Sequence, residues 1–358
     1  MHKKQCLKWL VAGFVSIAGG CQPEEVPTQS STGTQEARLE AAVGSWSVNA
    51  PPESFTGWRE ATLLDSGLVM SVQEGSMALY NPYSDSWRTL RGPMVFARTQ
   101  GASVTRLSSG KVLLAGGRDN ATHTLLFDPA TESWSYQGNL AEGRAWHTAT
   151  LLDSGQVLVT GGIYSLRGQR RSAELYEPAT GTWSSVQPLP EPLSGHAATL
   201  LYSGKVLVTG GSSLSWALPG DPVRSAAYLF DPATRAWSPA GHMSRARRGH
   251  VSIRLYSGSV LVAGDADTSS EVYDPYNDQW LPGPSLPIPE PYVSATMLYS
   301  GEVLVLNTSG QGALYDPSAN AWRLTASTQQ VQGYSLALLL HTGQVLAIGE
   351  SAMERFTR

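Results

Sequence analysis

The sequence predicts an all-β fold, a closed ring of seven four-stranded blades, and three observations lead to this prediction. A Gly ends a tight turn seven times along the chain, and a Trp recurs seven times in register with these turns. Successive turn glycines are separated by 42 residues (Gly301 to Gly343) to 54 residues (Gly204 to Gly258), which is near the period of propeller blades. The first and last segments of the chain also complement each other. The turn glycines are Gly67, Gly110, Gly155, Gly204, Gly258, Gly301 and Gly343, and the tryptophans are Trp46, Trp87, Trp134, Trp183, Trp237, Trp280 and Trp322.

Each unit opens with two apolar strands. In the fourth unit, residues 197–204 form the first strand with its turn, and residues 205–211 form the second. Both are rich in Leu and β-branched residues and end at turn residues, as strands do. The Gly that closes the turn between them tolerates the positive φ of a tight hairpin.

In six units the third and fourth strands are separated by an aromatic residue, then Asp, Asn or Glu, then Pro. Proline cannot donate a hydrogen bond to the next strand and Asp caps the turn, so the chain must reverse there. The fourth strand then carries the Trp. The turns are Tyr80-Asn81-Pro82, Phe127-Asp128-Pro129, Tyr176-Glu177-Pro178, Phe230-Asp231-Pro232, Tyr273-Asp274-Pro275 and Tyr315-Asp316-Pro317.

The two ends of the repeat array complete one blade. Residues 43–51 (VGSWSVNAP) read as a fourth strand without the three before it, and residues 351–358 (SAMERFTR) read as a third strand without a fourth. We therefore expect the N-terminal strand to close the last blade, with Trp46 buried near Phe356. Such closure leaves no open surface between blades and fixes the termini.

The pattern resembles the kelch repeat over residues 45–358. The double glycine of that family stands at Gly116-Gly117, Gly161-Gly162 and Gly210-Gly211, and an Arg-x-x-His runs from Arg144 to His147. The first unit departs from the family with Ser71-Val72, the sixth with Asn307-Thr308 and the seventh with Gly349-Glu350. The resemblance implies a seven-bladed propeller that binds its partners noncovalently.

Residues 1–20 have the features of an export signal. Lys3, Lys4 and Lys8 precede an apolar run, residues 9–18, that is too short for a permanent membrane span. Small residues then lead to Cys21, which resembles a bacterial lipoprotein signal in which this Cys becomes the lipidated first residue. The alternative is an ordinary secretory signal with an incidental Cys.

Residues 21–44, rich in Pro, Gln, Ser, Thr, Gly and Glu, are expected to form a lipidated flexible tether. The chain has only two cysteines, Cys6 and Cys21, so we expect no disulfides in the ring. Gln22, rather than Asp, after Cys21 favours the outer membrane of the bacterial cell envelope. The formal net charge is −4, and loss of the leader's lysines makes the rest more acidic, which argues against a nucleic-acid partner. We expect a monomer.

Loop lengths indicate which face of the ring binds a partner. The turns that join the first strand to the second, and the third to the fourth, are short and alike. The loops of residues 163–172 and 212–225, on the opposite face, are long and irregular. Variable loops on a rigid scaffold commonly carry binding sites, and exposed aromatics beside Arg suit sugars, carboxylates or peptides. A solvated loop without a ligand is the alternative. The candidate binding residues are Trp58, Trp146, Tyr164, Arg167, Arg170, Arg171, Trp216, Arg224, Arg247, Arg248, Tyr292 and Tyr334.

Three histidines at the start of the first strands, His147, His196 and His250, suggest an axial metal site as one hypothesis. The resemblance favours histidines that pack and hydrogen-bond between blades, and no carboxylate or Cys completes a ligand pattern. We expect no metal and no cofactor. The copper radical oxidases of kelch-like fold need a Cys cross-linked to a Tyr, which a lipidated Cys21 could not provide.

The sequence predicts a binding module for a protein or glycan at the cell envelope rather than an enzyme. It contains no GxSxG, HExxH or DxDxDG string. The alternative is a carbohydrate-active enzyme, mutarotase-like or glycosidase-like, that uses carboxylates on the variable face, where Glu60, Asp119, Asp265 and Asp267 are the candidates. No catalytic residue is assigned.

Overall fold

The structure, a computed structural model, describes residues 42–49, 60–73, 75–92, 100–118, 122–164, 170–212, 222–265, 267–289, 291–331, 333, 336–349 and 352–358. All of them belong to the compact unit Ala41–Arg358. The expected leader, and the expected tether up to residue 41 with Cys21, lie outside the described residues. Within the described ranges, no helix has the length and apolar character needed to cross a bilayer.

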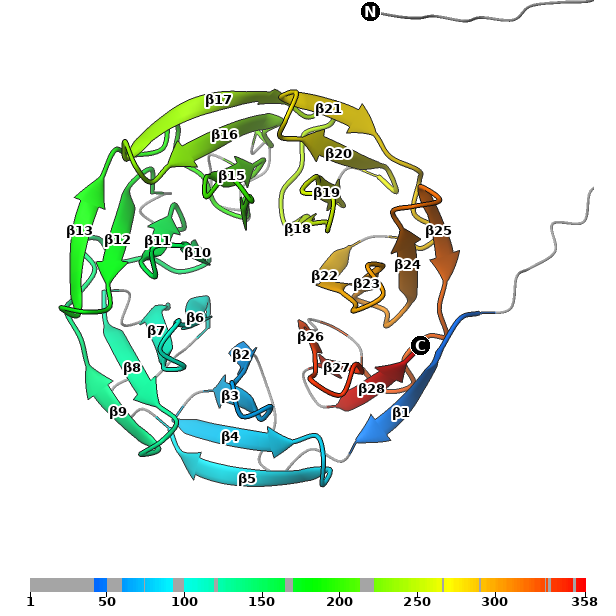
Figure 1. The fold of residues 1–358 in the computed structure, drawn as a ribbon, viewed down its shortest axis with the longest axis horizontal. Coiled ribbons are helices and arrows are strands. Elements are labelled where there is room, and N and C mark those ends of the chain that lie inside the picture. Colours follow the sequence, from blue (N-terminus) through cyan, green and yellow to red (C-terminus); the bar gives the residue numbers. More distant parts are fainter. Residues whose placement is uncertain are drawn as a thin grey trace, which may run out of the picture. The chain divides into compact units, whose positions relative to one another are not determined.

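The described residues form an all-β propeller of seven antiparallel sheets, each with four strands, arranged in a ring (Figure 1). The strands of blades 1 to 4 are β2 (Glu60–Leu63), β3 (Val69–Gln73), β4 (Ser76–Asn81) and β5 (Ser86–Arg91); β6 (Ala102–Arg106), β7 (Val112–Gly116), β8 (Thr124–Asp128) and β9 (Ser133–Tyr136); β10 (Thr148–Leu151), β11 (Val157–Thr160), β12 (Ala173–Glu177) and β13 (Thr182–Val186); β14 (Ala197–Leu200), β15 (Val206–Thr209), β16 (Ala226–Asp231) and β17 (Ala236–His242). The strands of blades 5 to 7 are β18 (Val251–Arg254), β19 (Val260–Ala263), β20 (Ser270–Asp274) and β21 (Gln279–Pro282); β22 (Tyr292–Met297), β23 (Val303–Asn307), β24 (Gly312–Asp316) and β25 (Ala321–Leu324); β26 (Leu336–Leu339), β27 (Val345–Ile348), β28 (Met353–Thr357) and β1 (Ser45–Asn49).

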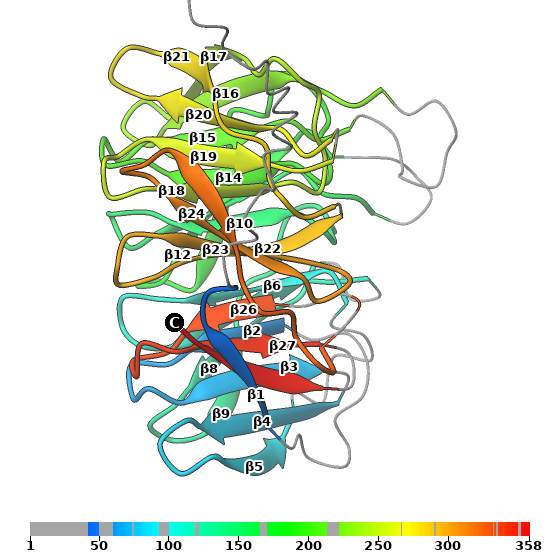
Figure 2. The ribbon, with the colours of Figure 1, turned by 90° about the vertical axis from the view of Figure 1, so that its right-hand side faces the viewer.

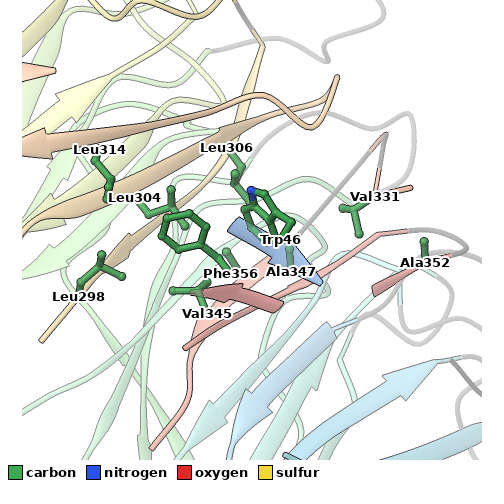
Figure 3. Close-up of a cluster of buried hydrophobic side chains, with 11 residues drawn as sticks. Trp46, Leu298, Leu304, Leu306, Leu314, Val331, Val345, Ala347, Ala352 and Phe356 are labelled. Carbon is green, nitrogen blue, oxygen red and sulfur yellow. The ribbon is translucent and has the colours of Figure 1, made fainter. Parts of the chain in front are cut away.

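The prediction of seven blades is confirmed, and so is the predicted closure by the N-terminal strand. In blade 7 the strand order is β26-β27-β28-β1, with Trp46 opposite Phe356 in the register. The two rings lie 5.1 Å apart between centroids, and the indole Nε1 donates to Ala326 O at 2.7 Å. Both side chains are buried in one apolar cluster with residues of blades 6 and 7, including Leu306 and Val345 (Figure 3). The N-terminal strand thus contributes to the core.

The landmark residues have the same positions in every blade. The turn glycines adopt positive φ, for example 84° at Gly155, as the hairpin requires. In the six other blades the aromatic residue of the third strand packs on the Trp of the fourth, with ring centroids 4.7–5.1 Å apart; Tyr80–Trp87 and Tyr273–Trp280 are two of these pairs. The pattern that fixed the repeat in the sequence is therefore an aromatic pair within each blade, in which the Tyr or Phe is buried and the Trp is partly buried, except for the buried Trp46.

The ring has two faces, which the edge-on view separates (Figure 2). At one face, short turns join the first strand of each blade to the second and the third strand to the fourth. We call this the short-turn face. The connections between the second and third strands, and between successive blades, lie at the other face, which we call the variable-loop face.

Candidate functional site

The candidate residues are only partly covered by the described ranges. Trp58, Arg167, Trp216 and Tyr334, and the candidate carboxylate Asp119, lie outside them, and Tyr292 is described only as the first residue of β22. Trp146, Arg248 and the arginines of blades 3 and 4 can be placed. Trp146 is partly exposed, has a φ of 51°, and its N–H donates to Gly101 O of the preceding blade at 2.8 Å.

Two candidate residues of blade 3, Tyr164 and Arg170, contact each other on the variable-loop face. The guanidinium carbon of Arg170 lies 5.4 Å from the centroid of the Tyr164 ring, a cation–π distance, and Tyr164 is 38% exposed. Arg170 also lies 3.6 Å from Glu142, while Arg171 is exposed and donates to Leu189 O at 3.2 Å. This places an aromatic ring against one cation, and a second cation follows in the chain at the surface.

Arg224 of blade 4 takes part in a neighbouring polar cluster. Its Nε is 2.7 Å from Glu191 Oε2, and the Tyr228 hydroxyl donates to Glu191 Oε1 at 2.9 Å. Burial, together with this bond to a carboxylate, raises the pKa of Tyr228 to about 12. Glu191 therefore neutralises much of the positive charge that Arg224 would present to a ligand.

Arg247 does not belong to the surface, so its prediction as an exposed binding residue was wrong. Its side chain is fully buried and donates to Gly264 O, to both oxygens of Ser269 and to Glu271. Arg144 of blade 3 makes the same contacts with Gly161 O, both oxygens of Ser172 and Glu174. A buried Arg persists only when such partners satisfy its charge and donors. The sequence held a clue, because Arg247 and His250 repeat the spacing of Arg144 and His147.

The three histidines lie between blades, which confirms the packing hypothesis. Each Nε2 meets a hydroxyl of the preceding blade: His147 meets Ser103 at 2.9 Å, His196 meets Thr148 and Thr160 at 3.0 Å, and His250 meets Thr209 at 2.7 Å. Burial, and then nearby arginines, lower the pKa values to about 3, 4 and 3, in the same order. The imidazoles are therefore neutral. The described part of the chain holds no group of three or more His, Cys, Asp or Glu arranged to bind a metal ion.

The double glycines and the histidines meet in the same contacts. A β-carbon on Gly116, Gly161 or Gly210 would lie 2.7–2.9 Å from Cε1 of the His in the next blade, which is closer than real β-carbons approach. The second glycine of each pair donates its N–H to a carbonyl of that next blade, as from Gly162 to Leu193 O at 2.9 Å. The absence of a side chain at these glycines lets the next blade approach.

The candidate carboxylates of the enzymatic alternative do not form one group. Glu60 begins β2 in blade 1, and burial raises the pKa of its carboxyl to about 8. Asp265 of blade 5 accepts the Arg248 N–H at 2.6 Å, and burial raises its pKa. Asp267 accepts the Ser269 N–H at 2.8 Å. Blades 1 and 5 do not adjoin in the ring, so the two carboxyl groups with raised pKa values are carried by separated blades (Figure 1).

Exposed tyrosines of the short-turn face were missed by reasoning from loop length. Tyr202, Tyr256 and Tyr299 follow the first strands of blades 4, 5 and 6, and each is more than half exposed. The tripeptide Tyr-Ser-Gly recurs at these three turns, so the sequence did carry a sign of them. Short turns of uniform length had suggested a face without a site.

Comparisons with known proteins support a kelch-repeat propeller. No protein-family profile matches the chain. The chain is 33% identical over 103 residues to "Kelch-like protein 21" of Rattus norvegicus and 31% identical over 118 residues to that of Danio rerio. These matches cover 27% and 30% of this chain but only 16% and 18% of the relatives, so the chain matches less than a fifth of their length.

The fold also resembles a solved structure, a "novel fungal alcohol oxidase with catalytic diversity among the AA5 family, in complex with copper". The two chains share 17% identity and superpose with a TM-score of 0.72 over 88% of this chain and 76% of the other. At this identity the likeness shows the fold alone. The chain is therefore a seven-bladed β-propeller, and its partial sequence matches are to kelch-like proteins.

Proposed function

We propose that this propeller is a noncovalent interaction module that binds a protein or a glycan through its variable-loop face. The observation that carries the proposal is the surface group of Tyr164, Arg170 and Arg171 in blade 3. An aromatic ring and guanidinium groups at a face rich in loops, above a rigid ring of sheets, form a recurrent type of recognition surface. The partial matches to kelch-like proteins are consistent with an interaction role.

The chemistry of this group suggests what the partner presents. Arg recognises carboxylate and phosphate oxygens in a planar, bidentate manner, and a tyrosine ring supplies rigid apolar area. The ion pair of Arg170 with Glu142 is at the surface, and such pairs contribute little to stability, so exchanging it for a pair with the partner costs little. We therefore expect acidic groups at the contact surface of the protein or glycan.

The proposed location is the bacterial cell envelope, where a diacylated Cys21 would hold the propeller at the outer membrane. Two acyl chains give stable membrane anchoring where one chain gives only marginal binding. Cys21→Ser should release a soluble protein with an unchanged melting temperature, because the apolar clusters of the described residues are formed by Val43 and residues after it. Mass spectrometry that finds an unmodified Cys21 thiol in the exported protein would refute the anchor.

The binding proposal is tested with Arg170→Ala/Arg171→Ala in the full chain. Immobilised wild type and variant are compared for capture of partners from envelope extract, and each captured partner is then titrated against both proteins. We expect at least about tenfold weaker binding by the variant, since loss of an anchor costs more than about 1.4 kcal/mol. Thr131→Ala and Thr180→Ala, in short turns of blades 2 and 3, are the controls and should bind as wild type does. Equal affinity of wild type and the double-Arg variant would disprove the proposed surface.

The alternative of a carbohydrate-active enzyme lacks a comparable observation. Among the candidate carboxyl groups that the structure describes, Glu60 has a pKa of about 8, so it would be protonated at neutral pH, as a general acid must be. Its described candidate partners, Asp265 and Asp267, are in blade 5, which does not adjoin blade 1. The binding module is therefore the function that the geometry supports best.

A further inference from the structure

The innermost turns of the short-turn face are linked into a closed ring. In each blade a Leu follows the first strand, and the residue after this Leu lies against the turn Gly of the next blade, so that seven side chains and seven glycines alternate around the axis. Tyr256 against Gly301 and Tyr299 against Gly343 are two of these contacts. We call these seven residues the turn rim: Asp65, Ser108, Asp153, Tyr202, Tyr256, Tyr299 and His341.

The turn rim has two chemically different halves. Blades 1 to 3 contribute Asp65, Ser108 and Asp153, whereas blades 4 to 6 contribute three successive tyrosines that are 56%, 60% and 62% exposed. Two further tyrosines stand in the second turns of their blades: Tyr276 of blade 5 adjoins the aromatic half, and Tyr83 of blade 1 lies beyond His341 of blade 7. Tyr276 lies beside Gly258 and is 74% exposed, and Tyr83 lies beside Gly67 and is 64% exposed. These five tyrosines are the tyrosine arc.

The tyrosine arc is a concentrated feature of the surface. Five of the seven exposed tyrosines in the described part of the chain lie in it, and the other two are Tyr136 and Tyr164. The exposed aliphatic side chains among the described residues, Val48, Leu281 and Leu324, lie instead on the outermost strands β1, β21 and β25. The arc is therefore aromatic without being generally hydrophobic.

The rings of the arc are held in place before any ligand binds. The guanidinium carbon of Arg254 lies 4.1 Å from the centroid of the Tyr202 ring, and Arg254 donates to Leu200 O. The Tyr256 hydroxyl donates to Leu298 O of the next blade at 3.3 Å. Tyr202 and Tyr256 are thus fixed by contacts with protein while more than half of each residue stays exposed. Rigid aromatic side chains of this kind bind with a small loss of conformational entropy.

From this arrangement we propose that the turn rim is a second binding surface, which takes a neutral oligosaccharide across the tyrosine arc. The flat C–H faces of pyranose rings pack on exposed aromatic rings, and sugar hydroxyls donate to carboxylates such as those of Asp65 and Asp153. Asp65 is paired with Arg106, which leaves Asp153 as the other carboxylate of the rim, so these residues present little net charge and favour a neutral ligand. The aliphatic anchors that usually accompany aromatics in a hydrophobic protein-binding groove are not among the exposed residues of the rim.

The test uses isothermal titration of the full chain with four neutral hexasaccharides as probes: cellohexaose, xylohexaose, maltohexaose and chitohexaose. At least one should bind, and Tyr256→Ala and Tyr299→Ala should each weaken binding by about tenfold or more. Tyr256→Phe keeps the ring and should bind within about threefold of wild type. Tyr256→Leu retains apolar packing on Gly301 without a flat ring, so it should bind as weakly as Tyr256→Ala.

Two matched variants separate this surface from other effects. Tyr136→Ala removes a tyrosine of similar exposure, 54%, at the end of β9 away from the turn rim, and should leave saccharide binding unchanged. Arg170→Ala/Arg171→Ala should also leave it unchanged, because it tests the variable-loop face alone. Melting temperatures of all variants verify folding. The proposal is overturned if none of the four probes binds, if Tyr256→Leu binds like wild type, or if the arc captures a protein but no saccharide.

Discussion

The seven contacts between neighbouring blades fall into two kinds, and the difference shows what the repeat motif encodes. Between blades 2 and 3, 3 and 4, and 4 and 5, a double glycine of one blade admits a histidine of the next, which hydrogen-bonds to a hydroxyl. The other four contacts have different residues at these positions. The histidine and the Gly-Gly pair are therefore two halves of one contact between blades, although they stand in different units of the sequence, and Leu193 replaces the Arg of Arg-x-x-His in one of the three contacts.

The contacts without a histidine use individual solutions. Between blades 7 and 1, Asn49 of the closing strand donates to the Tyr80 hydroxyl at 3.2 Å, and Arg355 lies 3.3 Å from Asp85. Between blades 6 and 7, Ser294 Oγ accepts the Ala337 N–H at 3.0 Å. The departures from the repeat pattern in the first, sixth and seventh units lie in this part of the ring, which also contains the closing strand β1.

The largest predicted effect is on the stability of blade 7, which β1 closes. Deletion of residues 45–50 removes Trp46 from its cluster with Phe356 and Val345 and leaves the outer edge of β28 unpaired. We expect the free energy of unfolding to fall by at least about 3–5 kcal/mol, the cost of truncating a buried Trp. Chemical denaturation measures it. Deletion of residues 22–40 is the control, and an unchanged midpoint for the 45–50 deletion would contradict the closure.

The buried Arg–Glu pairs should be nearly as costly to break. Arg144→Met leaves Glu174 buried without its cation, which should cost about 3 kcal/mol or more, while Arg171→Ala at the surface should cost less than about 0.5 kcal/mol. In blade 7, Glu354 accepts backbone N–H groups of Gln329, Gln330 and Val331. A similar cost for Arg144→Met and Arg171→Ala in urea denaturation would show that the pair is unimportant.

The histidine contacts should make the ring sensitive to mild acid. The folded-state pKa values of about 3 to 4 lie below the value of about 6.5 for an unfolded chain, so the unfolded state binds more protons as the pH falls. Stability is fully present above pH 6.5 and is lost progressively toward pH 4. Each imidazole contributes at most about 1.4 kcal/mol per pH unit.

His196→Gln should reduce that slope by about this amount between pH 6 and pH 4.5. The matched control is His341→Gln, since His341 is exposed in a turn of blade 7. Denaturation at a series of pH values gives the slopes. An unaltered slope for His196→Gln would mean that this imidazole accepts a proton in the folded ring.

The smallest predicted effect is a loss of stability as the pH rises, opposite in sign to that of the histidines, and it concerns Glu60 in blade 1. Glu60 occupies in blade 1 the strand position that Thr148 occupies in blade 3. Thr148 meets His196 of the next blade, whereas the blade next to Glu60 has Ala102 at the position of that histidine. The Glu60 pKa of about 8 exceeds the unfolded value of 4.5, so the stability due to the protonated carboxyl is present below pH 4.5 and lost as the pH rises through 8. Glu60→Gln should therefore stabilise the ring at pH 8, by about 1–2 kcal/mol for this partly buried side chain, and have no effect at pH 4.5. Thermal melts that show the same gain at both pH values would refute this.

The fold could be predicted because its landmarks are local. The positive φ of a turn such as that at Gly155 selects Gly, and the Trp of the fourth strand packs within its own blade. The sites were harder to predict because they depend on neighbours. Arg247 belongs in sequence to a loop but is buried by Ser269 and Glu271. The tyrosines of the tyrosine arc lie in turns of uniform length, so loop length gave no sign of a binding site there.

The claim that the double glycine exists to admit the next blade can be tested most directly by comparing Gly161→Ala with Gly249→Ala. The two glycines have φ of 61° and 58°, so an added methyl group meets the same backbone strain of about 1–2 kcal/mol at both. At Gly249 the new β-carbon meets no atom within 4 Å, whereas at Gly161 it meets Leu193 O and lies 2.7 Å from the His196 ring. We predict that Gly161→Ala lowers the free energy of unfolding by at least about 2 kcal/mol more than Gly249→Ala does. Equal losses for the two variants would contradict the account.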